Sequence, residues 1–235
     1  MIPQRLAFMA ISPALSLVIL GCHGRKPDLE STEKDRGSIA CSAGTGYFPP
    51  ITENETGGLF FGADQAEWET NYLRHMNERS LYACGQANAE PEYRFLWDRS
   101  LSEPISVRLV VHANGSGTLF ARELKHGGLL PPVPPGRKGK TWDEWLTVKL
   151  DKQTDVTPDQ VERARSLFNQ IEFGRYVAGP EGLTTDGSDW IYESRVSGRY
   201  RLIDFRNKPS NIAKQAGFYM VFDLAKISIP SNAVY

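Results

Sequence analysis

Two runs of alternating residues, each followed by a tight turn, constrain the fold of this chain most strongly. In the first, residues 107–111 alternate between two faces, and Asn114-Gly115-Ser116-Gly117 follows them. Because Asn and Gly tolerate the positive φ that tight β-turns require, we predict a β-hairpin centred on Gly115 and Ser116. The cross-strand pairs that this centre predicts are Val111 with Phe120 and Arg108 with Glu123.

A second hairpin is predicted around Ser197-Gly198, since residues 190–194 alternate before this turn and residues 201–205 after it. Its predicted pairs are Trp190 with Phe205, Tyr192 with Ile203 and Ser194 with Arg201. Residues 93–98 alternate in the same way, which is the period-two pattern of a half-buried strand.

Helical spacing surrounds these strands. Aromatic and apolar residues recur every four positions from Trp68 to Met76, which predicts a helix over residues 65–80. Further helices are predicted to start at the capping boxes Thr141 to Glu144 and Thr157 to Gln160, and a closing amphipathic helix after Pro209. The chain therefore predicts an α+β fold in which antiparallel hairpins pack against amphipathic helices.

Residues 1–21 have the composition of a secretory signal peptide. Arg5 precedes an apolar run from Leu6 to Leu20 that is too short and too weakly flanked for a membrane span. We predict that this segment is removed and that the mature chain begins at Cys22. Because the removed part carries only Arg5, the mature net charge is −2, which implies neither nucleic acid nor an anionic surface as partner.

Ile19, Leu20, Gly21 and Cys22 resemble the lipobox of the bacterial lipoprotein family: an aliphatic residue, a tolerated second position, Gly or Ala, and Cys. The resemblance implies acyl chains on Cys22 and a stable membrane anchor that faces the periplasm. His23 stands where Asp would signal retention in the inner membrane, so the outer membrane is favoured. The alternative is an ordinary signal followed by an accidental cysteine.

Cys41 and Cys84 remain as a pair once Cys22 is lipidated. A disulfide between them fits an oxidising periplasm, and closing this loop contributes on the order of 4 kcal/mol on the chain-entropy model. Two buried thiols or a metal pair are the alternatives, although neither cysteine has another Cys or a His within four residues.

Residues 22–40 are predicted to form a flexible tether, because their alternating charges leave little apolar surface to bury. Residues 41–235 are predicted to form a single α+β domain. Two blocks of this domain are similar to a group of uncharacterised bacterial proteins, and the blocks look structural rather than catalytic. They comprise residues 93–97, 104–109 and 121–124, and then Gly187, Trp190, Glu193, Gly198, Arg199 and Tyr200.

We predict no catalytic, cofactor-binding or metal-binding residues. Neither His-x-x-x-His nor Cys-x-x-Cys occurs, and Ser116 with nearby His112 lacks the Gly-x-Ser-x-Gly elbow of a nucleophile. Glu67, Glu69 and Glu193 are candidate carboxylates for glycan hydrolysis, but we expect them to be ordinary exposed side chains.

Two functions remain, and we expect the first. The chain is a lipid-anchored periplasmic binding protein without catalysis, which includes the case of an immunity or inhibitor protein, and residues 44–48 and 56–61 are its candidate partner-facing loops. Alternatively, it is an envelope hydrolase acting on peptidoglycan or lipid. That reading requires a cleft holding two of Glu67, Glu69, His75, His112, Glu193 and Asp204.

Overall fold

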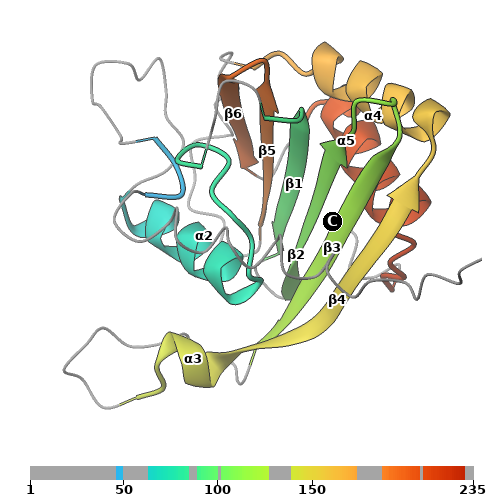
Figure 1. Ribbon diagram of the computed structural model, residues 1–235. Helices are drawn as coiled ribbons and strands as arrows, with labels where there is room; N and C mark the ends of the chain where they lie inside the picture. Colours follow the sequence, from blue (N-terminus) through green and yellow to red (C-terminus); the bar gives the residue numbers. More distant parts are fainter. Residues whose placement is uncertain are drawn as a thin grey trace, which may run out of the picture. The chain divides into compact units, whose positions relative to one another are not determined.

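Six antiparallel strands form one sheet in the order β4-β3-β2-β1-β5-β6 (Figure 1). The strands are β1 (Glu92–Arg99), β2 (Ser102–Val111), β3 (Gly117–His126), β4 (Leu146–Val156), β5 (Ser188–Val196) and β6 (Arg199–Arg206). This computed structural model describes residues 46–49, 63–84, 89–99, 102–126, 139–173, 187–206 and 209–230, all within the compact unit Arg36–Tyr235. The sheet and its helices confirm the α+β class.

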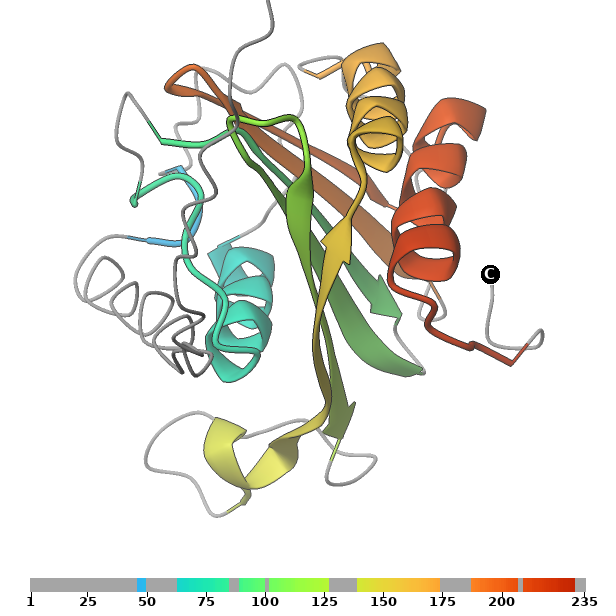
Figure 2. The same ribbon diagram turned by 45° about the vertical axis from the view of Figure 1, so that its right-hand side comes forward.

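Helices lie against both faces of the sheet, as Figures 1 and 2 show. On one face lie α4 (Pro158–Gln170) and α5 (Asn211–Phe218), and α5 continues as the π-helical segment η3 (Tyr219–Leu224). Against the other lies α2 (Ala63–His75), while the short α3 (Trp142–Trp145) leads into β4. We call these two sides of the sheet the α4 face and the α2 face.

The α4 face carries the larger apolar core, and aromatic rings fill its centre. Phe95 of β1 stacks on Tyr192 of β5 with ring centroids 4.7 Å apart, and Trp97 meets Trp190 at 4.6 Å. Phe168 of α4 closes over Tyr192 at 5.7 Å. Because burial of each large apolar side chain contributes about 1.5–3 kcal/mol, these rings fix α4 to the sheet.

Strand β1 is not half-buried as its alternation predicts. All of its residues except Asp98 are buried, because helices cover both faces of the sheet. The positions between its aromatic residues therefore do not face solvent. They face α2, and they include the charged side chains of Glu92 and Arg94.

The second hairpin has the predicted register, but the first does not. Trp190 pairs with Phe205 and Tyr192 with Ile203, as predicted. In the first hairpin the predicted pairs of Val111 with Phe120 and Arg108 with Glu123 are wrong. The observed pairs are Val111 with Gly117, Leu109 with Leu119 and Arg108 with Phe120. This register places apolar residues together on the α4 face. Their burial stabilises the hairpin more than the single cross-strand ion pair of the predicted register would.

The predicted helix starts at Thr141, at Thr157 and after Pro209 are confirmed, the first two with both bonds of a capping box. Helix α2 ends at His75, earlier than predicted, and Asn77 then adopts a φ of 53°, a left-handed conformation that Asn tolerates. Strand β4 was not predicted, because most of its side chains are exposed and polar at the edge of the sheet.

Replacing Gly217 of α5 with Ala tests the packing of this helix. Gly to Ala in a helix interior ordinarily stabilises by about 1 kcal/mol. Here an added Cβ would lie 2.7 Å from the Tyr192 hydroxyl oxygen and 2.8 Å from the Phe95 ring. We therefore expect G217A to lower the free energy of unfolding by about 1–3 kcal/mol in denaturant titrations. N169A on the exposed side of α4 is the control and should change stability by no more than about 0.5 kcal/mol. If G217A were more stable than wild type, this would contradict the close approach of Gly217 to Tyr192 and Phe95.

Candidate functional site

Charged side chains are concentrated, and buried, on the α2 face of the sheet. Ionisable side chains are almost never fully buried unless they are paired, so such a concentration marks a candidate site. The buried members include Glu69, Glu78, Glu92, Arg94, Arg108, Arg122, Glu193, Arg195 and Asp204. Two groups stand out at this face, one in which arginines pair with carboxylates and one made of carboxylates, and an aromatic cluster also packs here.

The first group is organised by Glu78, which follows helix α2. Arg94 of β1 and Arg108 of β2 are direct cross-strand partners, an arrangement of like charges that destabilises a sheet. The negative charge of the Glu78 carboxylate offsets this repulsion. Its Oε2 accepts a 2.6 Å hydrogen bond from Nε of Arg108 and lies 3.8 Å from Nη1 of Arg94, while Oε1 accepts from Arg122 of β3.

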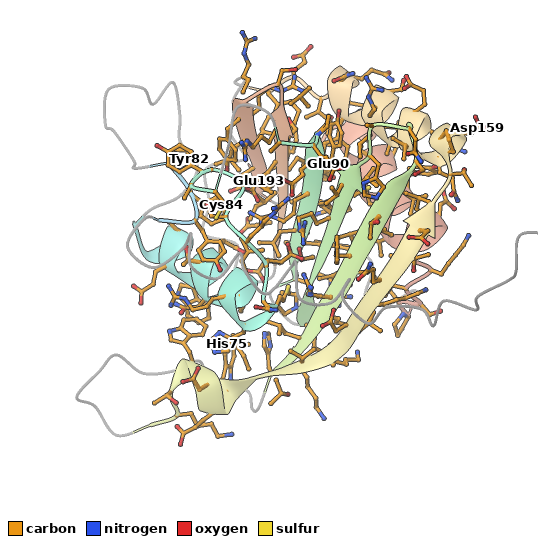
Figure 3. The ribbon with its side chains drawn as sticks, viewed as in Figure 1. His75, Tyr82, Cys84, Glu90, Asp159 and Glu193 are labelled. Carbon is orange, nitrogen blue, oxygen red and sulfur yellow. The ribbon has the colours of Figure 1, made fainter. Side chains whose placement is uncertain are left out.

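Three further carboxylates complete this group. Glu193 of β5 accepts from Nε of Arg94 at 2.6 Å and from the Tyr200 hydroxyl at 2.8 Å. Figure 3 shows Glu193 on the side of the sheet where the segment with Tyr82 and Cys84 lies. Glu92 accepts from Arg79 and Arg108, and Asp151 from Arg122. Four guanidiniums therefore meet four carboxylates, and we call this set the arginine network: Arg79, Arg94, Arg108, Arg122, Glu78, Glu92, Asp151 and Glu193.

The network lowers the pKa of its central acid. Burial raises the pKa of Glu78, but Arg108, Arg122 and Arg94 together outweigh burial and hold this pKa below its ordinary value of 4.5. Glu78 is therefore ionised at neutral pH. Its role is structural, because all the groups it faces are protein side chains that it neutralises.

Five rings form an aromatic cluster where α2, α3 and the end of β3 meet. Trp68 and Trp142 pack edge to face with centroids 4.8 Å apart, and His126 stacks on Trp145 at 4.2 Å. Tyr72 lies among them and is buried like Trp145, whereas Trp68 and Trp142 remain partly exposed. Burial lowers the pKa of His126, so its imidazole is neutral at pH 7. One side of the aromatic cluster therefore belongs to the apolar core, and its other side lies at the protein surface.

The second charged group contains carboxylates alone. Asp98 of β1 and Asp189 of β5 are direct cross-strand partners, and the side chain of Glu69, from α2, lies close to both. One carboxylate oxygen from each of the three lies within 4.8 Å of the others. We call Glu69, Asp98 and Asp189 the carboxylate cluster; Asp204 of β6 lies close enough to act on Glu69 electrostatically.

The carboxylate cluster is costly when fully ionised. At an effective dielectric of about 20, two charges 4.8 Å apart repel by about 3.5 kcal/mol. Burial and then the charge of Asp189 raise the pKa of Asp98 to about 7, and burial followed by Asp98 and its neighbours raises that of Glu69 well above its ordinary value. An arrangement like this holds protons or a hard cation, since oxygen ligands of this kind are what such cations bind.

Two of the three proposed lipidation and disulfide residues, Cys22 and Cys41, lie outside the described residues. Cys84 follows α2 and is partly buried, and no disulfide joins residues that are both described. The predicted bond from Cys41 to Cys84 stays a prediction. Of the candidate loops, residues 44–45 and 56–61 lie outside the described part, and Tyr47 and Phe48 are buried in the core.

The candidate nucleophile and base do not form a pair. The His112 ring nitrogens lie 2.9 Å from Oε1 of Glu90 and 2.9 Å from Oγ1 of Thr118. The Ser116 hydroxyl donates to Oδ1 of Asn114 at 2.8 Å, within its own turn. Both residues are engaged in local structure of the first hairpin, which gives no support to a catalytic role.

The expectation of ordinary exposed carboxylates is correct for Glu67 and wrong for Glu69 and Glu193. The wrong expectation has a physical cause: an α2 helix laid across the sheet buries one side of itself and the strand positions beneath it. Glu69 approaches Asp204, whereas Glu193 belongs to the arginine network. Sequence reasoning missed Asp98 and Asp189, because their opposition depends on the β1–β5 pairing between segments far apart in the chain.

A scan against protein-family models finds no match, and searches of curated proteins and of solved structures also find none. Within the part of the chain that the structure describes, no helix is long and apolar enough to cross a membrane.

Replacing Glu78 with Gln tests the arginine network. The variant leaves Arg94, Arg108 and Arg122 without their shared charge, so we expect it to lower the free energy of unfolding by about 3–5 kcal/mol at pH 7. Because the folded-state pKa of Glu78 lies below 4.5, its contribution is present above that pH and is lost as the pH falls further. The gap between wild type and E78Q should narrow below pH 4.5 in denaturant titrations.

The matched control is E162Q, since Glu162 also pairs with an arginine but is 70% exposed. An exposed pair contributes little, so this variant should change stability by less than about 1 kcal/mol. If E162Q and E78Q had equal effects, or if the effect of E78Q did not vary with pH, the charge of Glu78 would not be the organising interaction.

Proposed function

We propose that this chain is a lipid-anchored protein of the bacterial cell envelope that binds another macromolecule and performs no catalysis of its own. The single observation that carries the anchor is the apolar run of residues 6–20 ending in Ile19-Leu20-Gly21-Cys22. A cysteine at this position accepts two or more acyl chains in the lipoprotein family, which is enough for stable anchoring. The domain would then face the periplasm, with the outer membrane favoured.

A disulfide between Cys41 and Cys84 is part of the same proposal. The periplasm is oxidising, and lipidation of Cys22 would leave these two cysteines as an even pair. The position of Cys84 is compatible with a structural purpose for the bond, because Cys84 lies six residues after Glu78, which belongs to the arginine network. The bond would tie this segment to the start of the domain.

The partly exposed side of the aromatic cluster supports binding. Trp68 and Trp142 present two tryptophan rings at the surface, and Val148 at the start of nearby β4 is 53% exposed. Trp is the residue type most enriched at binding hot spots. The acidic side chains of Glu67 and Asp143 are exposed beside these rings, Asp143 to 93%. This surface fits a protein partner with an apolar protrusion and a basic rim.

No observation favours the hydrolase hypothesis enough to make it a second proposal. A pocket among the described residues, at the β5–β6 turn, is lined by Val196, Ser197, Arg199 and Arg201. It contains none of the six acids and histidines that this hypothesis requires. Glu69 and Asp204 do approach each other, but in a buried cluster and not in that pocket.

The intact mass of the native protein, purified from its own membrane, tests the anchor and the disulfide. We expect the mass of residues 22–235 plus acyl chains, with two thiols that alkylate only after reduction. A C22A chain should carry no acyl chains. A full-length, unlipidated mass with three free thiols would overturn the anchor and the disulfide together.

Capture from detergent-solubilised native membranes tests the binding surface. We expect wild type to retain a protein partner and W142A to retain it about tenfold less, because loss of a hot-spot aromatic costs at least this much affinity. Y82A is the matched control, since Tyr82 is another exposed aromatic, at 41%, on a different segment. Unfolding of both variants is measured so that loss of folding is not read as loss of binding.

Equal retention by W142A and Y82A would exclude the aromatic cluster as the binding surface. Reproducible capture of no protein at all from wild type would contradict the binding function itself.

A further inference from the structure

Two pairs of like charges lie directly opposite each other on the α2 face. Arg94 and Arg108 share the carboxylate of Glu78. Asp98 and Asp189 meet the same problem with the opposite sign. There helix α2 brings Glu69, a third carboxylate, close to the other two. Helix α2 thus places a third acid beside Asp98 and Asp189. By contrast, Glu78, which follows α2, relieves the repulsion between Arg94 and Arg108.

Glu69 gives an independent sign that something binds at this point. Its side chain is fully buried, and no N–H or hydroxyl group of the described residues donates to either carboxylate oxygen; the group that it meets is another acid, Asp98. Glu78 and Glu193 are buried to the same degree, but each accepts two or more hydrogen bonds. A buried acid without donors, aimed at two more acids, calls for a positive partner.

We propose that Glu69, Asp98 and Asp189 form a binding site for one divalent cation, and that the cation is Ca²⁺. The proposal goes beyond the proposed function and does not rest on it.

The donor set selects the class of ion. All three donors are carboxylates, whereas Zn²⁺ sites are built mainly from Cys and His ligands. Ca²⁺ binds oxygen at about 2.3–2.6 Å, so ligand oxygens on opposite sides of one ion are about 5 Å apart, and the 4.8 Å limit of this cluster fits that span. Mg²⁺ requires a tighter octahedron and retains several waters, which suits a buried, irregular set of carboxylates less well.

A cation here would join three elements of the fold. Glu69 belongs to α2, Asp98 to β1 and Asp189 to β5. Binding would therefore fix α2 against the centre of the sheet. Trp68 precedes Glu69 in the chain, so the same ion would also hold the partly exposed side of the aromatic cluster in place.

Thermal unfolding of the full chain, first in EDTA and then with Ca²⁺ or Mg²⁺, is the direct test. We expect saturating Ca²⁺ to raise the wild-type Tm by about 5–10 °C, and Mg²⁺ at the same concentration to raise it much less. Tb³⁺ provides a second readout, because it replaces Ca²⁺ and emits when a nearby tryptophan is excited. Each ligand is adjacent in sequence to a tryptophan, namely Trp68, Trp97 or Trp190. We expect Tb³⁺ emission that Ca²⁺ abolishes by competition.

E69Q separates a metal site from ordinary surface acidity. The variant replaces a buried acid, whose ionised form the cluster disfavours, with a neutral amide, so it should fold and should have a higher Tm than wild type in EDTA. It should also lose the Ca²⁺-dependent rise in Tm and the Tb³⁺ emission. E67Q, two residues away on the exposed side of α2, is the matched control and should retain both responses.

Three outcomes would overturn the proposal. If Ca²⁺ left the wild-type Tm unchanged while E69Q still raised it in EDTA, the carboxylates would share protons and bind no metal. If E69Q and E67Q responded to Ca²⁺ alike, binding would be non-specific. A rise in Tm with Mg²⁺ alone would overturn the assignment to Ca²⁺.

Discussion

The buried carboxylate of Glu78 is the interaction on which the α2 face of the sheet depends. Three neighbouring strands each place an arginine beneath the segment that follows α2, and two of these arginines are direct cross-strand partners. Removing three guanidiniums from water is strongly unfavourable unless a charge of opposite sign is fixed among them. Glu78 supplies that charge from outside the sheet. The central strands can therefore be covered on both sides, and the α4 face can hold an uninterrupted aromatic core.

The two faces consequently follow different physical rules. On the α4 face, register and packing are set by apolar surface, and a change of volume such as the one at Gly217 is the main hazard. On the α2 face, charged rows alternate with an apolar row. Arg94 pairs with Glu193, Leu96 with Ile191 and Asp98 with Asp189 along the β1–β5 ladder. The first row pairs opposite charges and the last pairs two acids, so like charges oppose each other at one end of this ladder.

Local signals in the sequence predicted the class of fold and several elements correctly. Capping boxes located the starts of α3 and α4, and the turn at Ser197-Gly198 gave the register of β5 and β6, because these features depend on residues close in the chain. The candidate site could not be predicted in the same way. Asp98 and Asp189 are ninety-one residues apart in the chain, and a polar residue in an alternating strand indicates solvent unless a helix covers that face. Strand β4 lacked a signal because its exposed residues are polar.

One segment, from α2 through Cys84, supplies a residue to every feature of the α2 face. Trp68 and Tyr72 belong to the aromatic cluster, Glu69 to the carboxylate cluster and Glu78 to the arginine network. Because these residues share one short stretch of backbone, an interaction that holds one of them in place also limits the positions of the others. The proposed cation at Glu69 and the proposed disulfide at Cys84 would act at two points of this stretch, and Glu78 of the arginine network lies between them in sequence. The orientation of Trp68 at the proposed binding surface would then depend on a metal ion and on the redox state of the compartment.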